Sequence, residues 1–243
     1  MWLILTSAIQ GLVSLCEARQ IPDHHGLKHA LAVLDNAAIA LRDFNLSLDE
    51  QISVLLAALL HDIDDRKFTT SADYSGARMI LSAIGYKDAE SVIDMIKLVS
   101  CSDNGNTINR TLPRWKYIPR DADRLEALGT IGIRRAKETT DSMAIQQNKE
   151  PVYWSDESPQ CTTREQVFLM AHPNRLINYQ KCKSSPDLIS HFFDKLLHIH
   201  TMSSGSKRLE QIAEIKRDIM IDFVIDFGKN ANKAYKIDWS RWI

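Results

Sequence analysis

The stretch SLDEQISVLLAALLHDIDD, residues 47–65, joins an apolar helix to a cluster of ionisable groups. Ser47 and Glu50 have the spacing of a capping box, in which a hydroxyl and a carboxylate satisfy the free amides of a helix start. Leucine and isoleucine then recur at helical spacing, which predicts a helix that faces a core. This helix runs directly into His61 and Asp62, so the pattern places polar, ligand-type side chains at the end of a buried element.

Helical periodicity extends over most of the chain, and we find no convincing alternating strand pattern. Residues 139–164 lose this period and are expected to form an irregular excursion. The sequence predicts an all-α fold with one domain over 1–243, its core at about 20–138 plus C-terminal helices at about 185–228. Further helices are expected near 1–16, 73–84, 87–101 and 119–138, with a loop at 101–106. Another helix is expected from a cap at Ser185 to Ile199. The last is expected over 207–227, with Gly228 as its C-terminal stop.

Composition limits the partners and the compartment. The 30 basic and 31 acidic residues nearly cancel, so we expect no long basic face for nucleic acid. The four cysteines form no CxxC pair, which argues against a cysteine zinc site or a disulfide framework and favours a reducing compartment. The apolar start lacks a basic n-region and is too short to span a bilayer. We therefore expect a cytoplasmic protein that binds no nucleic acid and no membrane, with homo-oligomerisation left open.

Ionisable groups interrupt apolar helices in three segments. His25 and His29 are four residues apart and share a helical face, His61 and Asp62 end the helix above, and residues 121–124 open a later helix. Each segment alone has an ordinary explanation, such as a satisfied core histidine or an aspartate that favours a helix start. Together, two imidazoles and two carboxylates suit Mn, Fe(II), Zn, Co or Mg. Spacing alone does not bring the three segments together.

The order of these segments resembles the HD-domain phosphohydrolase superfamily, whose ligands are a His, a His-Asp pair and a distant Asp. Within it, the chain is similar to small bacterial nucleotide pyrophosphohydrolases, whose His-Asp-x-x-Asp-x-Lys-Phe pattern is met from His61 to Phe68. Later segments are met by DADRLEALGTIGIRR, residues 121–135, and HFFDKLL, residues 191–197. The resemblance covers about residues 20–228 and implies an all-helical HD-domain bundle.

A metal site follows from the resemblance, with His29, His61, Asp62 and Asp123 as ligands. Asp123 is chosen over Asp121 because relatives commonly keep Ala-Asp at this point. The cofactor implied is one divalent metal ion, manganese first, with Mg, Co, Fe, Ni or Zn as alternatives.

The resemblance also implies roles in a reaction. Asp65 falls where relatives place a carboxylate that positions or deprotonates the attacking water; the alternative is a solvated acid at a helix end. Lys67, Arg135 and Lys195 match basic positions in the relatives, and we expect them to bind phosphate oxygens. Lys67 is also a catalytic candidate. The string from His25 to Ala30 is similar to cyclic-nucleotide phosphodiesterases, whose first histidine donates a proton. His25 is therefore a catalytic candidate, with a plain helix-face histidine as the alternative.

Two differences between this sequence and HD-domain proteins bear on the expected function. Gly26 and Ala32 replace an Asp and an Arg that the bacterial relatives usually carry. No histidine lies between Asp62 and Asp123, where HD-type oxygenases and dinuclear phosphodiesterases take further ligands, so a mononuclear hydrolytic site is expected. The expected function is hydrolysis of nucleoside triphosphates to monophosphate and pyrophosphate, with a small phosphorylated substrate, a nucleotide, as partner. The alternatives are a phosphomonoesterase, a cyclic-nucleotide phosphodiesterase, or a catalytically decayed nucleotide-binding module.

Overall fold

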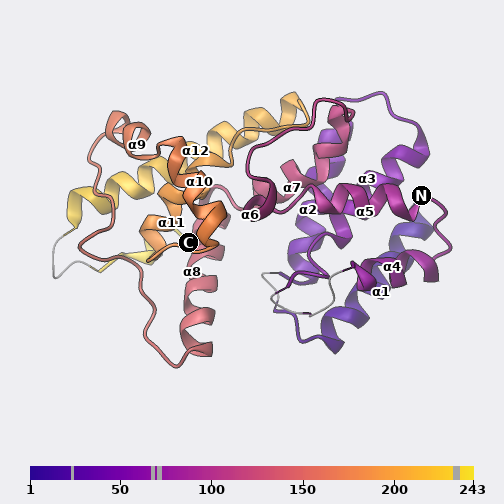
Figure 1. Ribbon diagram of the computed structural model, residues 1–243, viewed down its shortest axis with the longest axis horizontal. Coiled ribbons are helices and arrows are strands. Elements are labelled where there is room, and N and C mark those ends of the chain that lie inside the picture. Colours follow the sequence, from indigo (N-terminus) through magenta and orange to yellow (C-terminus); the bar gives the residue numbers. More distant parts are fainter. Residues whose placement is uncertain (23–24, 67–68, 70–72, 232–235) are drawn as a thin grey trace. The chain divides into compact units, whose positions relative to one another are not determined.

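The structure is a computed structural model of the 243-residue chain, and it describes all residues except 23–24, 67–68, 70–72 and 232–235 (Figure 1). The described residues form helices joined by turns and irregular segments, and none of them lies in a strand, so the all-α prediction is confirmed. The chain divides into two compact units, each made of three stretches. The single domain expected from the sequence stays a prediction. The first unit is Met1–Ser100, Thr107–Leu125 and Met202–Leu209; the second is Cys101–Asn106, Glu126–Thr201 and Glu210–Ile243.

The centre of the first unit is α3 (Leu48–Leu60), in which every residue from Ile52 to Leu60 is buried. The predicted capping box is present, because Ser47 Oγ accepts from the Glu50 amide and the Glu50 carboxylate accepts from the Ser47 amide. The helices α1 (Trp2–Ala18), α2 (Leu27–Leu41) and α5 (Ala89–Lys97) contact α3, and α4 (Ser75–Ala83) contacts α1 and α5. No described helix is both long and apolar enough to cross a membrane.

The single helix predicted over 119–138 is two helices. The 3₁₀ turn η1 (Arg114–Tyr117) leads into α7 (Ile118–Glu126), and α8 (Gly129–Gln146) begins three residues later. Between them Leu128 is extended, and Gly129 has φ +67°, a left-handed value that glycine adopts without strain. The apolar spacing continues through this break, which is why periodicity alone does not reveal it.

The second unit corrects several predicted boundaries. The helix α8 takes in the first part of the predicted excursion, and residues 147–163 contain no helix. Asp187, rather than Ser185, caps α11 (Leu188–Asp194), since its carboxylate accepts from the Ser190 amide at 2.7 Å. The loop predicted at 101–106 instead contains the short helix α6 (Cys101–Asn104), and the helix predicted up to Ile199 is divided into α11 and the 3₁₀ turn η2 (Leu196–His198). No element was predicted for α9 (Arg164–Met170), α10 (Pro173–Cys182) or η3 (Trp239–Arg241).

The last helix, α12 (Lys207–Asn230), continues past Gly228, so the predicted stop at Gly228 is wrong. A Cβ atom at this position would lie 2.1 Å from the carbonyl oxygen of Cys161. The glycine therefore allows the helix and the chain at Cys161 to approach closely, which is a packing requirement that local sequence does not reveal.

Candidate metal centre

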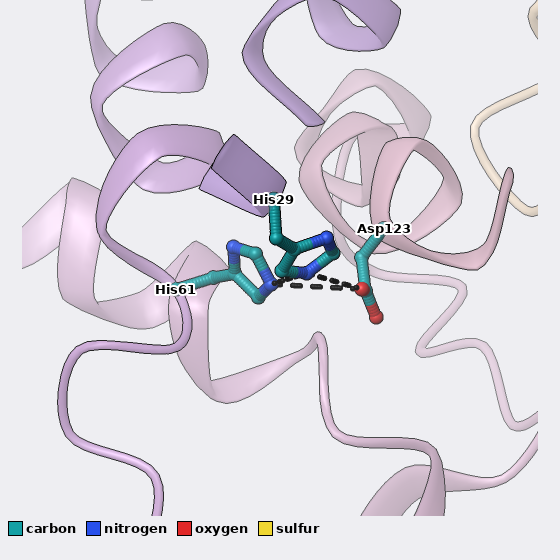
Figure 2. A group of neighbouring side chains, drawn as sticks. All are labelled: His29, His61 and Asp123. Atoms are coloured by element: carbon teal, nitrogen blue, oxygen red, sulfur yellow. Dashed lines mark hydrogen bonds and ion pairs between the residues drawn. The ribbon is translucent and has the colours of Figure 1, made fainter. Parts of the chain in front are cut away.

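Three elements far apart in sequence bring His29, His61 and Asp123 together in the first unit (Figure 2). His29 stands in the first turn of α2, which begins after Gly26. His61 is the residue that ends α3, and Asp123 lies within α7. Figure 2 shows the three side chains pointing toward one another, and one ligand atom from each lies within 4.8 Å of the others.

The separations suit ligands of one ion. His29 Nε2 lies 3.2 Å from His61 Nε2, and Asp123 Oδ1 lies 3.3 Å from the first nitrogen and 3.5 Å from the second. Two atoms that bind one ion at about 2.1 Å are roughly 3.0–3.4 Å apart at octahedral and tetrahedral angles. Nitrogen and oxygen donors at this spacing can hold a divalent ion such as Mn, Fe(II) or Zn.

The fourth predicted ligand, Asp62, faces the same nitrogens. Its Oδ1 lies 3.4 Å from His61 Nε2 and its Oδ2 lies 3.6 Å from His29 Nε2. The side chains of the two histidines are 1% exposed, whereas those of Asp62 and Asp123 are 21% and 27% exposed. The centre is therefore closed on its imidazole side and accessible on its carboxylate side.

Neighbouring groups orient two of these side chains. His61 Nδ1 lies 2.8 Å from the carbonyl oxygen of Ala58, which can only accept. Nδ1 therefore donates, so that in the neutral ring Nε2 is the unprotonated nitrogen facing the centre, an arrangement typical of metal-binding histidines. His25 Nδ1 lies 3.0 Å from Asp62 Oδ2. This contact gives His25 a part in orienting Asp62, while the proton donation inferred from the resemblance stays a prediction.

Charges in the centre balance one another. Burial alone would lower the pKa of His61, but the carboxylates of Asp62 and Asp123 outweigh it and raise that pKa to about 9. Burial would likewise raise the pKa of the two aspartates, yet the neighbouring imidazoles hold both well below their ordinary value. Protonated His61 thus supplies part of the positive charge that a divalent ion would bring to the same carboxylates.

Asp64 has a structural role that the sequence analysis did not assign. Its two carboxylate oxygens accept from the amides of Gly76 at 3.0 Å and Ala77 at 2.8 Å, in the first turn of α4. Arg19, directly after α1, pairs with the same carboxylate at 2.9 Å. Asp64 therefore caps α4 from a distant part of the chain and ties it to α1.

The catalytic and phosphate-binding roles of the remaining predicted site residues stay predictions. The helix α3 ends at Leu60 and residues 61–64 form turns, so Asp65 does not continue the helical face of His61. The Asp65 amide donates to the Asp62 carbonyl at 3.0 Å, and its role in catalysis stays a prediction. Lys67 lies outside the described residues. Arg135 in α8 and Lys195 at the end of α11 belong to the second unit, and their contacts with phosphate are untested.

A buried polar network supports α7, and the sequence analysis did not find it. Asp121, fully buried, accepts from the amides of Ser203 at 2.7 Å and Ser204 at 2.6 Å. Arg120, also fully buried, donates to the Ser203 hydroxyl and to the Thr107 carbonyl. The Ser-Ser-Gly-Ser segment at 203–206 thus anchors the helix that carries Asp123.

Comparison with known proteins adds relatives by sequence. No family model matches the chain. It is 34% identical over 221 residues to protein L803 of Acanthamoeba polyphaga mimivirus, which covers 84% of this chain and 88% of that protein. It is 26% identical over 178 residues to YpgQ of Bacillus subtilis, covering 72% and 70% of the two chains.

Solved structures share the fold. A structural-genomics target from Lactobacillus plantarum matches with a TM-score of 0.67 and 21% identity, over 94% of this chain and 97% of that one. Bacillus subtilis YpgQ, solved in complex with ADP, matches with a TM-score of 0.60 and 22% identity, over 95% and 97%. The sequence match to the viral protein spans most of both chains, and the protein therefore belongs to the family of mimivirus L803.

Proposed function

We propose that this protein is a metal-dependent phosphohydrolase of the HD-domain type that converts nucleoside triphosphates to monophosphates and pyrophosphate. The observation that carries the proposal is the convergence of His29, His61, Asp62 and Asp123, in the order of the HD-domain ligands. A nucleotide ligand is supported by YpgQ, whose solved structure contains ADP.

The four ligands fit a divalent ion by donor type, spacing and orientation. When bound, such an ion would lower the pKa of a water molecule and so supply a nucleophile for hydrolysis. The chain's own part is to present two imidazole Nε2 atoms and two carboxylates together, and His61 would release its proton when an ion binds. The Ala58 carbonyl orients His61, and His25 orients Asp62. A substrate phosphate is proposed to approach from the carboxylate side, where the side chains of Asp62 and Asp123 are partly exposed.

The reaction that we propose is an in-line displacement at the α-phosphorus. The water oxygen bonds to phosphorus, the bond to the bridging oxygen breaks, and pyrophosphate leaves with that electron pair. Asp65 accepts the proton of the attacking water. Lys67, Arg135 and Lys195 are the cations proposed to offset charge on the phosphoryl oxygens, and they would matter more for a triphosphate than for a small monoester.

Phosphorus NMR of the purified protein with manganese and each nucleoside triphosphate tests the proposal. We expect monophosphate and pyrophosphate in equal amounts. Orthophosphate and nucleoside without pyrophosphate would instead identify a phosphomonoesterase, and turnover of cyclic nucleotides alone would identify a phosphodiesterase. His61→Ala should abolish turnover and lower bound metal together, whereas the exposed His172→Ala should change neither.

A further inference from the structure

A second group of ionisable side chains lines a cavity within the second unit. The cavity has a volume of about 200 Å³, and its lining includes apolar residues of α9, η2 and α12, among them Phe168, Leu197 and Ile221. His198, His200 and Arg217 also line it. None of these residues belongs to the first unit, so the cavity is not part of the metal centre.

Arg217 brings a positive charge to the cavity wall. Its guanidinium lies 4.8 Å from the centre of the Phe168 ring, and no carboxylate of the described residues forms an ion pair with it. Other arginines of this unit differ, because Arg164, Arg175 and Arg241 each pair with an aspartate. Arg217 therefore has its forked donors available for an anion.

The two histidines present hydrogen-bond acceptors. His198 Nε2 lies 2.8 Å from the Phe193 carbonyl oxygen, and His200 Nδ1 lies 3.0 Å from that of Leu197. A carbonyl only accepts, so these nitrogens carry the protons, and the second nitrogen of each ring bonds to no described residue. Burial lowers the pKa of His198, and burial together with Arg217 lowers that of His200 to about 4. Both rings are therefore neutral at pH 7, with one unprotonated nitrogen each.

We propose that this cavity is a second ligand site, which binds a small carboxylate with an apolar body and a hydroxyl or N–H donor. Arg217 pairs with the carboxylate through its fork, one of the bare histidine nitrogens accepts from the donor, and the apolar wall covers the body. A single arginine matches the two oxygens of a carboxylate, whereas a phosphate dianion would need more donors and would meet two acceptors. The volume is below the roughly 300–1,000 Å³ of drug-sized sites, which limits the ligand to a small molecule.

Three related probes test this chemistry on the full chain in metal-free buffer. We expect 4-hydroxybenzoate to bind saturably in calorimetry, benzoate to bind about 2–10-fold more weakly without its hydroxyl donor, and 4-hydroxybenzyl alcohol about 10–100-fold more weakly without its charge. Binding should persist in His61→Ala, which separates this site from the metal centre. If none of the three probes binds saturably, the proposal is wrong.

Variants then locate the site. Arg217→Gln should weaken the binding of 4-hydroxybenzoate about 10–100-fold, because the charge-assisted pair with the carboxylate is lost. The binding of 4-hydroxybenzyl alcohol, which has no carboxylate, should stay nearly unchanged. Ala171→Leu should fill the cavity and weaken both probes. Arg241→Gln, an exposed arginine of the same unit, is the matched control and should change nothing. Thermal melts verify folding, and a well-folded Arg217→Gln protein with undiminished carboxylate binding overturns the assignment.

Discussion

Asp64 and Asp65 are neighbours in the chain, but Asp64 has a structural role and Asp65 is a predicted catalytic residue. Asp64 accepts the first amides of α4 and pairs with Arg19, so its carboxylate is committed to structure. Asp65 follows the turn that carries Asp62, and its amide donates to the Asp62 carbonyl. The resemblance to a known family singles out Asp65, whereas the structural role of Asp64 is revealed only by its three-dimensional contacts.

Replacing Asp65 by asparagine tests its proposed role as the base. We expect turnover to fall by roughly 10²–10⁴-fold, the effect of losing a positioned proton acceptor, while bound metal and melting temperature stay near those of the parent protein. Steady-state kinetics with metal analysis measures both. Asp156→Asn, in an exposed loop of the second unit, is the control. Near-normal turnover of Asp65→Asn would mean that another group accepts the proton.

His61 links metal binding to pH. Its pKa of about 9 in the metal-free protein means that it is protonated at pH 7, whereas a ligand must be neutral. We expect ion binding to release about one proton from His61 below pH 9, and none well above it. Calorimetry in buffers of different ionisation enthalpy measures the release, and His61→Ala should lose it.

The same shift bears on the stability of the metal-free protein. Because the folded pKa of His61 lies above its ordinary 6.5, the stabilisation is fully present below pH 6.5 and is lost as pH rises through about 9. Metal-free protein should therefore have a lower melting temperature at pH 9.5 than at pH 6.5, because the stabilisation from protonated His61 is lost. For the proton release on ion binding described above, a value that does not vary between pH 7 and pH 10 would contradict a pKa of about 9 for His61.

At the scale of elements, Gly228 shows how a helix can depend on a distant segment. The added methyl group of Gly228→Ala would meet backbone atoms of Cys161, which cannot rotate away as a side chain could. We expect the free energy of unfolding to fall by about 1–3 kcal/mol, the usual cost of overpacking. Urea denaturation measures it, with the exposed neighbour Lys229→Ala as control. Unchanged stability would show that the chain at Cys161 can move aside.

Helices that carry their own signals were predictable from sequence. The capping box at Ser47 and the apolar run behind it give α3 and the position of His61 at its end. The break before Gly129 and the close approach at Gly228 were not predictable, because each depends on a conformation or a neighbour that local pattern does not encode. The clustering of His29, His61 and Asp123 required a family resemblance, since spacing does not bring distant helices together.

At the scale of the whole molecule, the first unit is discontinuous in sequence. Its four predicted ligands lie before residue 126, yet it also includes Met202–Leu209. This last stretch gives the amides of Ser203 and Ser204 to Asp121, and Ser206 and Arg208 bond to Asp43. The ligand set and its structural support therefore come from different parts of the chain.

A fragment of residues 1–125 tests this dependence. It keeps all four ligands but leaves the Asp121 carboxylate without its amide donors, and a buried carboxylate without partners is costly. We expect the fragment to lose a sharp thermal transition and to bind manganese more weakly than the full chain. Circular dichroism melts and metal titration measure this. A sharp transition with parent-like affinity would show that residues 202–209 are dispensable for the centre.

The discontinuity of the first unit also affects the order in which its parts become available during protein synthesis. A ribosome adds about 5–20 residues per second, so Leu209 is made roughly 4–17 s after Leu125. Throughout that interval the nascent chain already displays its histidines and aspartates, while the donors for Asp121 and Asp43 have not been synthesised. If the centre depends on these donors, it forms only after most of the polypeptide has been synthesised, and a metal ion bound earlier would meet ligands that lack their supporting contacts.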